Sequence, residues 1–135
     1  MHTKKITFEN SDGHRLAALL DLPVDFEKLT EAGSMMGSGG MIVMDDRTCM
    51  VDVARYFLEF LLEESCGKCT PCREGNFWMQ NLTTRIWEGG GDKTDVELLH
   101  NVAKNIQGKC LCALGEFSTM AVVSSIERFS EDFKV

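Results

Sequence analysis

The sequence is poor in basic residues and contains neither a long apolar run nor an export signal. Lys and Arg number 14 against 21 Asp and Glu, which gives a formal net charge of -7 over 135 residues. This acidic balance argues against nucleic-acid partners and anionic membrane surfaces, both of which attract basic proteins. No apolar run approaches the roughly 20 residues of a spanning helix, so we expect no direct membrane insertion. The opening residues MHTKKITFEN lack the apolar core of a signal peptide, so we expect no export.

Several catalytic and nucleotide-binding motifs are also missing. Residues 37–40 read GSGG, which is neither G-x-G-x-x-G nor G-x4-G-K-[ST], so we expect no NADH or FMN site on this chain. The histidines His2, His14 and His100 form no H-E-x-x-H motif, which argues against a hydrolytic zinc site. No G-x-S-x-G elbow supplies a serine nucleophile. We therefore do not expect the chain to be a complete enzyme.

The first third of the chain has the pattern of short strands. Residues 6–22 alternate with period two around an Asn-Ser-Asp-Gly turn, which predicts a β-hairpin. A short helix over residues 26–32, a Gly- and Ser-rich loop and a strand over residues 41–44 should follow. We expect these elements to form a small N-terminal region over residues 1–47.

From residue 48 onward, apolar residues recur at spacings of three and four, which predicts amphipathic helices. Four are expected, joined by short links. The second should start near Arg73, and the third should open with a capping box of Thr94 and Glu97. The predicted core positions are Met50, Ala54, Phe57, Leu61, Trp78, Leu82, Ile86, Trp87, Val96, Leu99, Ala103, Ile106, Val122, Ile126, Phe129 and Phe133. The chain should therefore be mostly α-helical, with a four-helix bundle over residues 48–135.

The six cysteines carry the most specific chemical information. In a chain without an export signal they indicate reduced thiols, and hence metal or redox chemistry rather than disulfides. Cys66, Cys69 and Cys72 follow the spacing C-x2-C-x2-C, which lets three thiolates converge on one inorganic body. A [4Fe-4S] cluster needs four such ligands, and the fourth can come from Cys110 or Cys112 in GKCLCALG. The residues alone leave that choice open.

Zinc is the alternative occupant, because thiolates bind it as well. Zinc sites usually take cysteines in separated C-x2-C pairs, so three in tandem with a remote fourth favour a cluster. Positive charge from Lys68, Arg73, Lys109 and the start of the following helix should favour an anionic cluster. Cys49 stands apart in the sequence and is expected to be a buried structural thiol.

Three stretches of the sequence together resemble one known family. They are EAGSMMGSGGMIVMDDRTCMVDVARYFLEF, EESCGKCTPCREG and NIQGKCLCALG. They look like the C-terminal part of the NADH-binding flavoprotein subunit of respiratory complex I, a module shared with NAD-linked hydrogenases and formate dehydrogenases. The resemblance implies a helical bundle holding one [4Fe-4S] cluster, which takes electrons from FMN and passes them on. By the family's pattern, the ligands would be Cys66, Cys69, Cys72 and Cys112.

The chain also departs from that family. The large FMN- and NADH-binding domain and most of a ubiquitin-like β-grasp domain have no counterpart, so residues 1–47 are expected to include a β-grasp remnant. Cys110 falls where the family usually has a residue that is not a ligand. Residues 115–126, GEFSTMAVVSSI, stand where the family commonly has an Asp and a Pro. FMN and NAD are therefore expected only on a partner chain, if at all.

The leading hypothesis is an electron-transfer module of an NADH-linked oxidoreductase complex. Its one cluster would relay electrons from a flavin on a partner chain to other iron-sulfur centres, and the module itself would be non-catalytic. Its partners would be flavin- and iron-sulfur-containing subunits. We expect a cytoplasmic location, with contact to the inner membrane only through those partners. One alternative is a structural docking module that binds zinc or a redox-silent cluster, and another is a truncated remnant of the flavoprotein subunit.

Overall fold

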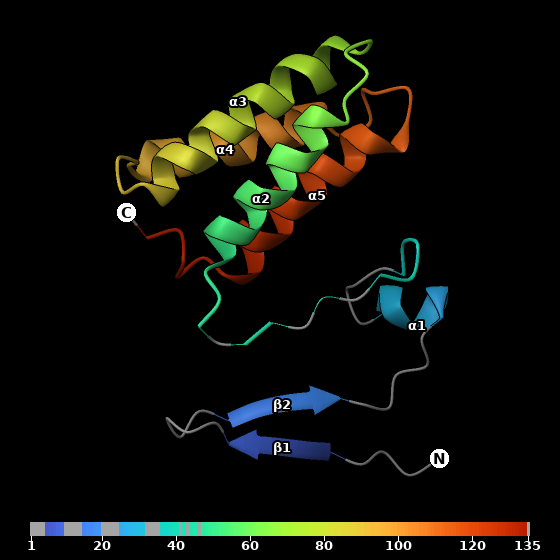
Figure 1. Cartoon of the computed structure of the whole chain (residues 1–135), viewed down its shortest axis with the longest axis vertical. Helices are drawn as coiled ribbons and strands as arrows, with labels where there is room; N and C mark the ends of the chain where they lie inside the picture. Colours follow the sequence, from blue (N-terminus) through green and yellow to red (C-terminus); the bar gives the residue numbers. More distant parts are fainter. Residues whose placement is uncertain are drawn as a thin grey trace. The chain divides into compact units, whose positions relative to one another are not determined.

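The computed structural model describes the backbone of residues 5–9 and 15–19 and, with side chains, residues 25–31, 36–40, 42, 44–45 and 47–134. Contacts divide the chain into two compact units, Met1–Val43 and Met44–Val135. The described part contains five helices and two short strands (Figure 1), which confirms the prediction of a mostly α-helical chain. Within these residues, none of the helices combines the length and the apolar character that a membrane crossing requires.

The first unit contains two strands and a short helix. Strands β1 (Lys5–Glu9) and β2 (Arg15–Leu19) pair antiparallel, and the turn predicted between them lies outside the described residues. Helix α1 (Phe26–Glu31) occupies the position predicted for a short helix. A strand was expected over residues 41–44, but the two residues that the structure describes there lie outside any strand.

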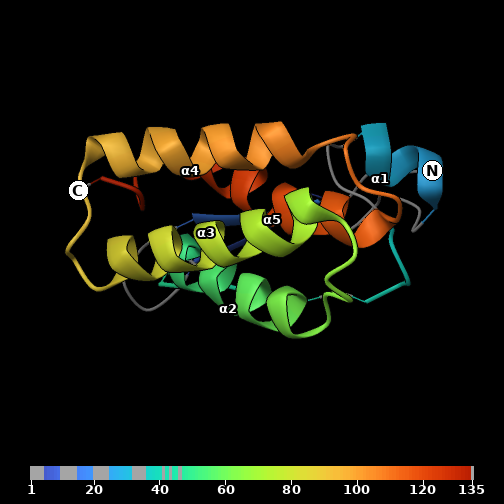
Figure 2. The ribbon, with the colours of Figure 1, turned by 90° about the horizontal axis from the view of Figure 1, so that it is seen from above.

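Four helices make up the second unit, the helical unit: α2 (Met50–Glu63), α3 (Thr70–Trp87), α4 (Lys93–Ile106) and α5 (Ala113–Arg128). Helix α2 packs against α3 and α5, and α4 packs against the same two helices (Figure 2). Because the links between consecutive helices are short, neighbouring helices run antiparallel. Helices α3 and α5 therefore begin at the end where α2 and α4 finish.

The core of the helical unit includes a large, fully buried apolar side chain from the middle of each helix. These side chains are Leu58 of α2, Met79 of α3, Leu99 of α4 and Val122 of α5. Phe133 is buried too, but it reaches the core from the tail that follows α5 rather than from a longer last helix. An apolar stripe on each of four helices accounts for one continuous core.

Three aromatic residues that were expected in the core are exposed. Trp78, Trp87 and Phe129 have exposed fractions of 54%, 48% and 47%. On α3 the buried face lies one residue further along, at Met79, which turns Trp78 outward. Helix α5 ends at Arg128, so Phe129 no longer follows its inner face. The core prediction is wrong at these three positions.

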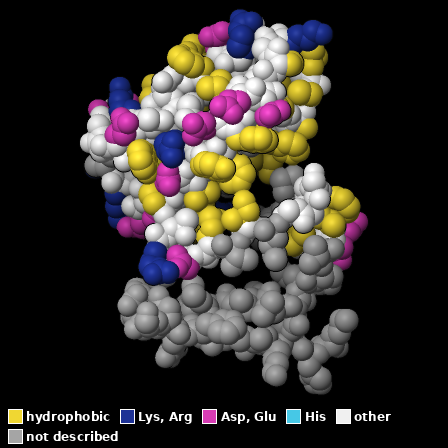
Figure 3. Space-filling view, viewed as in Figure 1, with side chains coloured by type: hydrophobic (Ala, Val, Ile, Leu, Met, Phe, Trp, Pro, Cys, Tyr) yellow, Lys and Arg dark blue, Asp and Glu magenta, His cyan; other side chains and the backbone are white. Residues whose placement is uncertain are grey.

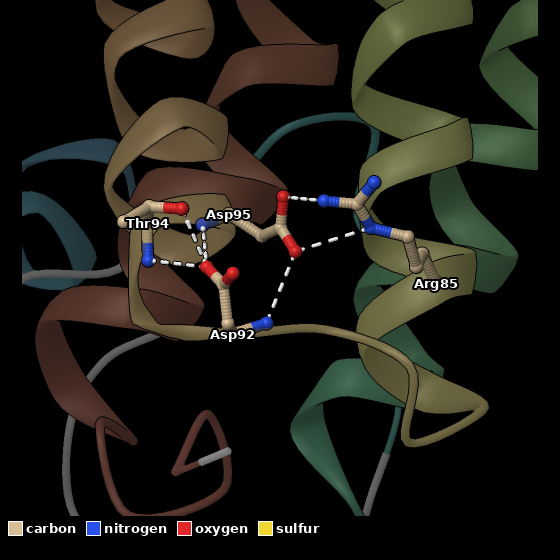
Figure 4. A network of polar contacts seen from close by, with 4 residues as sticks. All are labelled: Arg85, Asp92, Thr94 and Asp95. Atoms are coloured by element: carbon tan, nitrogen blue, oxygen red, sulfur yellow. Dashed lines mark hydrogen bonds and ion pairs between the residues drawn. The ribbon is translucent and has the colours of Figure 1, made fainter.

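The link between α3 and α4 is closed by two carboxylates (Figure 4). Asp92 is the N-cap of α4, and its Oδ1 accepts the backbone N–H groups of Thr94 at 2.7 Å and Asp95 at 3.1 Å. Asp95 Oδ2 accepts the Asp92 N–H at 3.0 Å and the Nε–H of Arg85 from α3 at 3.1 Å. The capping box therefore consists of Asp92 and Asp95, and the predicted box of Thr94 and Glu97 is wrong.

Helix α2 begins at the same end of the helical unit, and a carboxylate serves it as well. The Met50 N–H donates to Asp132 Oδ2 at 2.7 Å, from the tail after α5. The Arg55 guanidinium lies over the Trp87 ring, 4.6 Å from its centroid, and so joins α2 to α3. Cys49 is the exposed N-cap of α2, so its predicted burial is wrong. We call this the capping end, where α2 and α4 begin.

Candidate metal-cluster site

Five cysteines from two segments gather around one cavity at the opposite end, which we call the cysteine end. They are Cys66 and Cys69 from the α2–α3 connection, Cys72 from the first turn of α3, and Cys110 and Cys112 from the α4–α5 connection. The cavity has a volume of about 140 Å³. Its other lining residues are Glu64, Ser65, Lys68 and Leu114. The structure thus brings together the four predicted ligands and Cys110, and leaves Cys49 at the capping end.

Two helices begin at this cavity, and each starts from a cysteine. Helix α3 begins at Thr70 rather than near Arg73, because a proline is well tolerated in a first helical turn. Cys69 is therefore the N-cap of α3, and Cys72 lies within its first turn instead of before it. Cys112 is the N-cap of α5, and neither N-cap side chain makes a capping hydrogen bond. The positive ends of two helix dipoles consequently meet the cavity.

Two of the sulfur atoms, those of Cys69 and Cys72, make hydrogen bonds with other groups of the protein. The Leu111 N–H donates to Cys69 Sγ at 3.4 Å, which ties the two cysteine-bearing loops together. The buried Cys72 Sγ lies 3.4 Å from Asn76 Nδ2 and 3.4 Å from Ser65 Oγ. Sequence reasoning missed Asn76, although a polar residue one helical turn after a ligand cysteine is a usable signal.

Cys110 differs from the other thiols in how tightly the protein packs it. Its half-buried side chain contacts the hydrophobic core and covers Gly115 in the first turn of α5. A Cβ atom at Gly115 would lie 2.5 Å from Cys110 Sγ, so only glycine leaves room for this thiol. Burial raises the pKa of the Cys110 thiol, and negative charge on Cys72 and Cys69 raises this pKa further. Cys112, in contrast, is exposed at the cavity.

The three cationic residues that were predicted to favour an anionic cluster differ in how they lie relative to the cavity. Lys68 lines the cavity. Arg73 donates to the Gly67 carbonyl at 3.2 Å and forms an ion pair with Glu74 at 2.8 Å, which offsets its charge. Lys109 is exposed and is not among the lining residues. Since exposed charges interact weakly through water, Lys68 and the two helix ends supply most of the local positive potential.

The spread of the thiols bears on what the cavity can hold. In the part of the chain that the structure describes, no group of His, Cys, Asp and Glu side chains is arranged to hold a metal ion. A zinc–thiolate bond of about 2.3 Å places tetrahedral sulfur ligands about 3.8 Å apart. A [4Fe-4S] cluster bonds each thiolate to a different iron, so its ligands surround a larger body. Five thiols that line a cavity of about 140 Å³ supply soft ligands of the kind that such a cluster takes.

The fold and the site together define a helical domain that presents clustered cysteines to a cavity at the starts of two helices. The chain belongs to the family described as the NADH-ubiquinone oxidoreductase-F iron-sulfur binding region, whose model matches residues 52–135. This match confirms the resemblance to the C-terminal iron-sulfur part of the NADH-binding subunit.

Similar proteins carry names from the same group. An F subunit of the NADH-quinone oxidoreductase of Rhizobium meliloti is 46% identical over 114 residues, covering 84% of this chain and 27% of the relative. The F subunit of the NADH-quinone oxidoreductase of Mycobacterium bovis is 42% identical over 114 residues, covering 84% and 26%. The HndC subunit of the NADP-reducing hydrogenase of Solidesulfovibrio fructosivorans is 40% identical over 115 residues, covering 85% and 24%. The chain thus spans about a quarter of the length of these curated relatives.

Proposed function

We propose that this chain is an electron-transfer module of an NADH-linked oxidoreductase, holding one [4Fe-4S] cluster that relays electrons from a flavin to other iron-sulfur centres. Residues 48–135 form the cluster-binding four-helix domain, and residues 1–47 form a hairpin with a β-grasp remnant. The cluster ligands are Cys66, Cys69, Cys72 and Cys112. These 135 residues contain no nucleotide-binding motif, so the flavin that donates electrons would lie outside them.

One observation carries the proposal. Thiols from two loops, distant in the sequence, line the same cavity, and this cavity lies at the starts of α3 and α5. Helix N-termini favour anions, and a thiolate-ligated cluster is anionic. The site therefore has the soft ligands, the space and the electrostatic environment that a cluster needs.

The residues of this chain position the cluster and tune its reduction potential, and they do not take part in a chemical reaction themselves. When bound, a [4Fe-4S] cluster accepts and releases one electron at a time. The four thiolates would hold it against the first turns of α3 and α5, and Lys68 would add positive charge at the cavity wall. These groups favour the more negative, reduced state and so ease electron uptake.

The surface of the helical unit supports dependence on partners. Figure 3 shows hydrophobic side chains exposed among acidic and basic ones on one face. Large exposed apolar residues of this unit include Tyr56, Phe60, Phe77, Leu111, Phe117 and Met120. A hollow of about 430 Å³ between α3 and α4, beside Trp78, adds to this apolar surface. Such a surface suits protein partners, which we assign as flavin- and iron-sulfur-containing subunits of a redox complex. We place the module in the cytoplasm, with contact to the inner membrane only through these subunits.

The proposal is tested by anaerobic purification of the chain, followed by iron, sulfide and zinc analysis. Electron paramagnetic resonance spectra are recorded before and after reduction with dithionite. We expect about four irons and four sulfides per chain, with a paramagnetic signal that appears on reduction. One zinc per chain, no sulfide and no signal would overturn the proposal and favour a structural zinc module. A cluster that dithionite cannot reduce would remove the relay role.

A further inference from the structure

Asn76 occupies a position where stability alone would favour an apolar side chain. It is fully buried in α3, on the face that also carries Met79. Its Oδ1 is buried without a hydrogen-bond partner. An unpaired buried carbonyl destabilises a fold, and each such group calls for an explanation. The contact that the structure gives to its amide is the one from Nδ2 to Cys72 Sγ, at 3.4 Å.

Cys72 Sγ receives a second polar contact from the other side of the loop. Ser65 Oγ lies 3.4 Å from this sulfur, and the Gly67 N–H donates to the same hydroxyl oxygen at 3.4 Å. Once Cys72 is a thiolate it can only accept, so the Ser65 hydroxyl must donate. Cys69, by comparison, receives a backbone N–H from Leu111. In the structure, two side chains from separate elements converge on one ligand sulfur.

We propose that Asn76 and Ser65 are positioning residues that hold the Cys72 thiolate and raise the reduction potential of the cluster. This inference rests on the proposed function. Reduction adds one electron to the cluster without making or breaking a bond. Because each donor points a partial positive charge at the sulfur, it stabilises the more negative reduced state more than the oxidised state. Burial of Cys72 and Asn76 strengthens the effect, since little water screens it.

The experiment uses the full chain, purified anaerobically with its cluster, in five forms. Ser65→Ala and Asn76→Leu each remove one donor, whereas Ser65→Thr keeps the hydroxyl. Thr83→Val is the matched control, because Thr83 is a fully buried polar residue of α3 whose hydroxyl donates to the Met79 carbonyl at 2.7 Å, away from the thiols. Each form is titrated with dithionite while the reduced signal is followed by electron paramagnetic resonance.

We expect midpoint potentials more negative than wild type for Ser65→Ala and Asn76→Leu, and wild-type potentials for Ser65→Thr and Thr83→Val. If Asn76→Leu does not assemble a cluster, the comparison of Ser65→Ala with Ser65→Thr decides the question. Unshifted potentials in the donor-removing variants would overturn the inference, as would an equal shift in Thr83→Val. A wild-type chain without any cluster would instead overturn the proposed function itself.

Discussion

The two ends of the helical unit meet the same physical requirement with different chemistry. Two helices begin at each end, and the first-turn N–H groups of any helix lack partners within that helix. At the capping end, Asp92 accepts first-turn N–H groups of α4, and Asp132 accepts the first N–H of α2. At the cysteine end, α3 and α5 start from Cys69 and Cys112, whose side chains cap nothing.

This difference suggests that the two ends of the helical unit have different roles, stability at one end and cluster binding at the other. The capping end supplies its own negative charges through Asp92 and Asp132, although the Cys49 side chain at the N-cap of α2 makes no capping hydrogen bond either. The cysteine end presents two positive helix ends to a cavity lined by thiols. A bound anionic cluster would therefore supply the negative charge there that Asp92 and Asp132 supply at the capping end. Changes at the cysteine end should therefore alter cluster content, and changes at the capping end should alter stability alone.

The largest effect should follow loss of a central thiol. Cys72→Ser removes a buried ligand in the first turn of α3, so we expect the chain to lose most of its iron and sulfide and its reducible signal. Iron and sulfide analysis with electron paramagnetic resonance measures this. Cys49→Ser is the matched control, because Cys49 is also a helix N-cap but lies at the capping end. Equal cluster loss in both variants would refute the distinction between the ends.

The two cysteines of the α4–α5 connection should respond differently. Cys112→Ser removes the proposed fourth ligand, so the iron content should fall and the cluster should become labile in air. The Cys110→Ser variant should keep the full wild-type content of iron and sulfide, because Cys110 is packed against Gly115 and the core. The same iron and sulfide analysis compares them. The reverse result would make Cys110 the ligand and Cys112 the spectator.

At the capping end, the largest loss of stability should come from Asp95. Asp95→Ala removes a buried carboxylate that accepts from Arg85 and from the Asp92 N–H, and we expect the free energy of unfolding to fall by about 1–3 kcal/mol. Denaturant unfolding of the cluster-loaded chain measures this change. Glu97→Ala is the control, as Glu97 is exposed on the same helix. Iron content should match wild type in both, and cluster loss in Asp95→Ala would contradict the account.

Removal of the N-cap of α4 should have a smaller effect. Asp92→Ala should lower the free energy of unfolding by less than Asp95→Ala does, because the Thr94 and Asp95 N–H groups lose an acceptor that is exposed to solvent. Asp92→Asn should retain most of the wild-type stability, since an asparagine oxygen caps almost equally well. Thermal or denaturant unfolding distinguishes the two. An Asn variant as unstable as the Ala variant would show that charge, rather than hydrogen bonding, holds this end.

The smallest effect is a dependence on pH. Hydrogen bonds from the Thr94 hydroxyl and backbone N–H hold the pKa of Asp92 below its ordinary value of 3.8. Its ionised form therefore contributes stability above that value, and the contribution is lost as the pH falls through the lowered pKa. Below about pH 4, wild type should lose more stability than Asp92→Asn, which cannot titrate. Urea unfolding at stepped pH checks this, and parallel curves would speak against it.

Features of the structure that are encoded over short distances along the chain are predicted well from the sequence. C-x2-C-x2-C spacing keeps three thiols close together along the chain whatever the fold, and helical periodicity locates α2 to α5. The start of α3 was missed because Pro71 indicates a first helical turn as readily as a stiff loop. The capping box was missed because Asp92 and Asp95 compete with Thr94 as helix-start signals.

Features that depend on helix rotation and on contacts between distant segments could not be predicted. Trp78 and Met79 are adjacent and both apolar, so periodicity could not decide which one faces the core. The contact of Asn76 with Cys72 becomes visible once the buried face of α3 is known. Packing of Cys110 against Gly115 likewise requires the geometry of the α4–α5 connection.

The central claim, that a cluster completes the cysteine end while the capping end is complete by itself, is tested most directly by amide hydrogen exchange. The chain is compared with its cluster in place and after anaerobic removal of iron by a chelator. We predict that exchange accelerates in the first turns of α3 and α5, while the first turns of α2 and α4 keep their protection. Equal acceleration at both ends, or no change at the starts of α3 and α5, would contradict the claim.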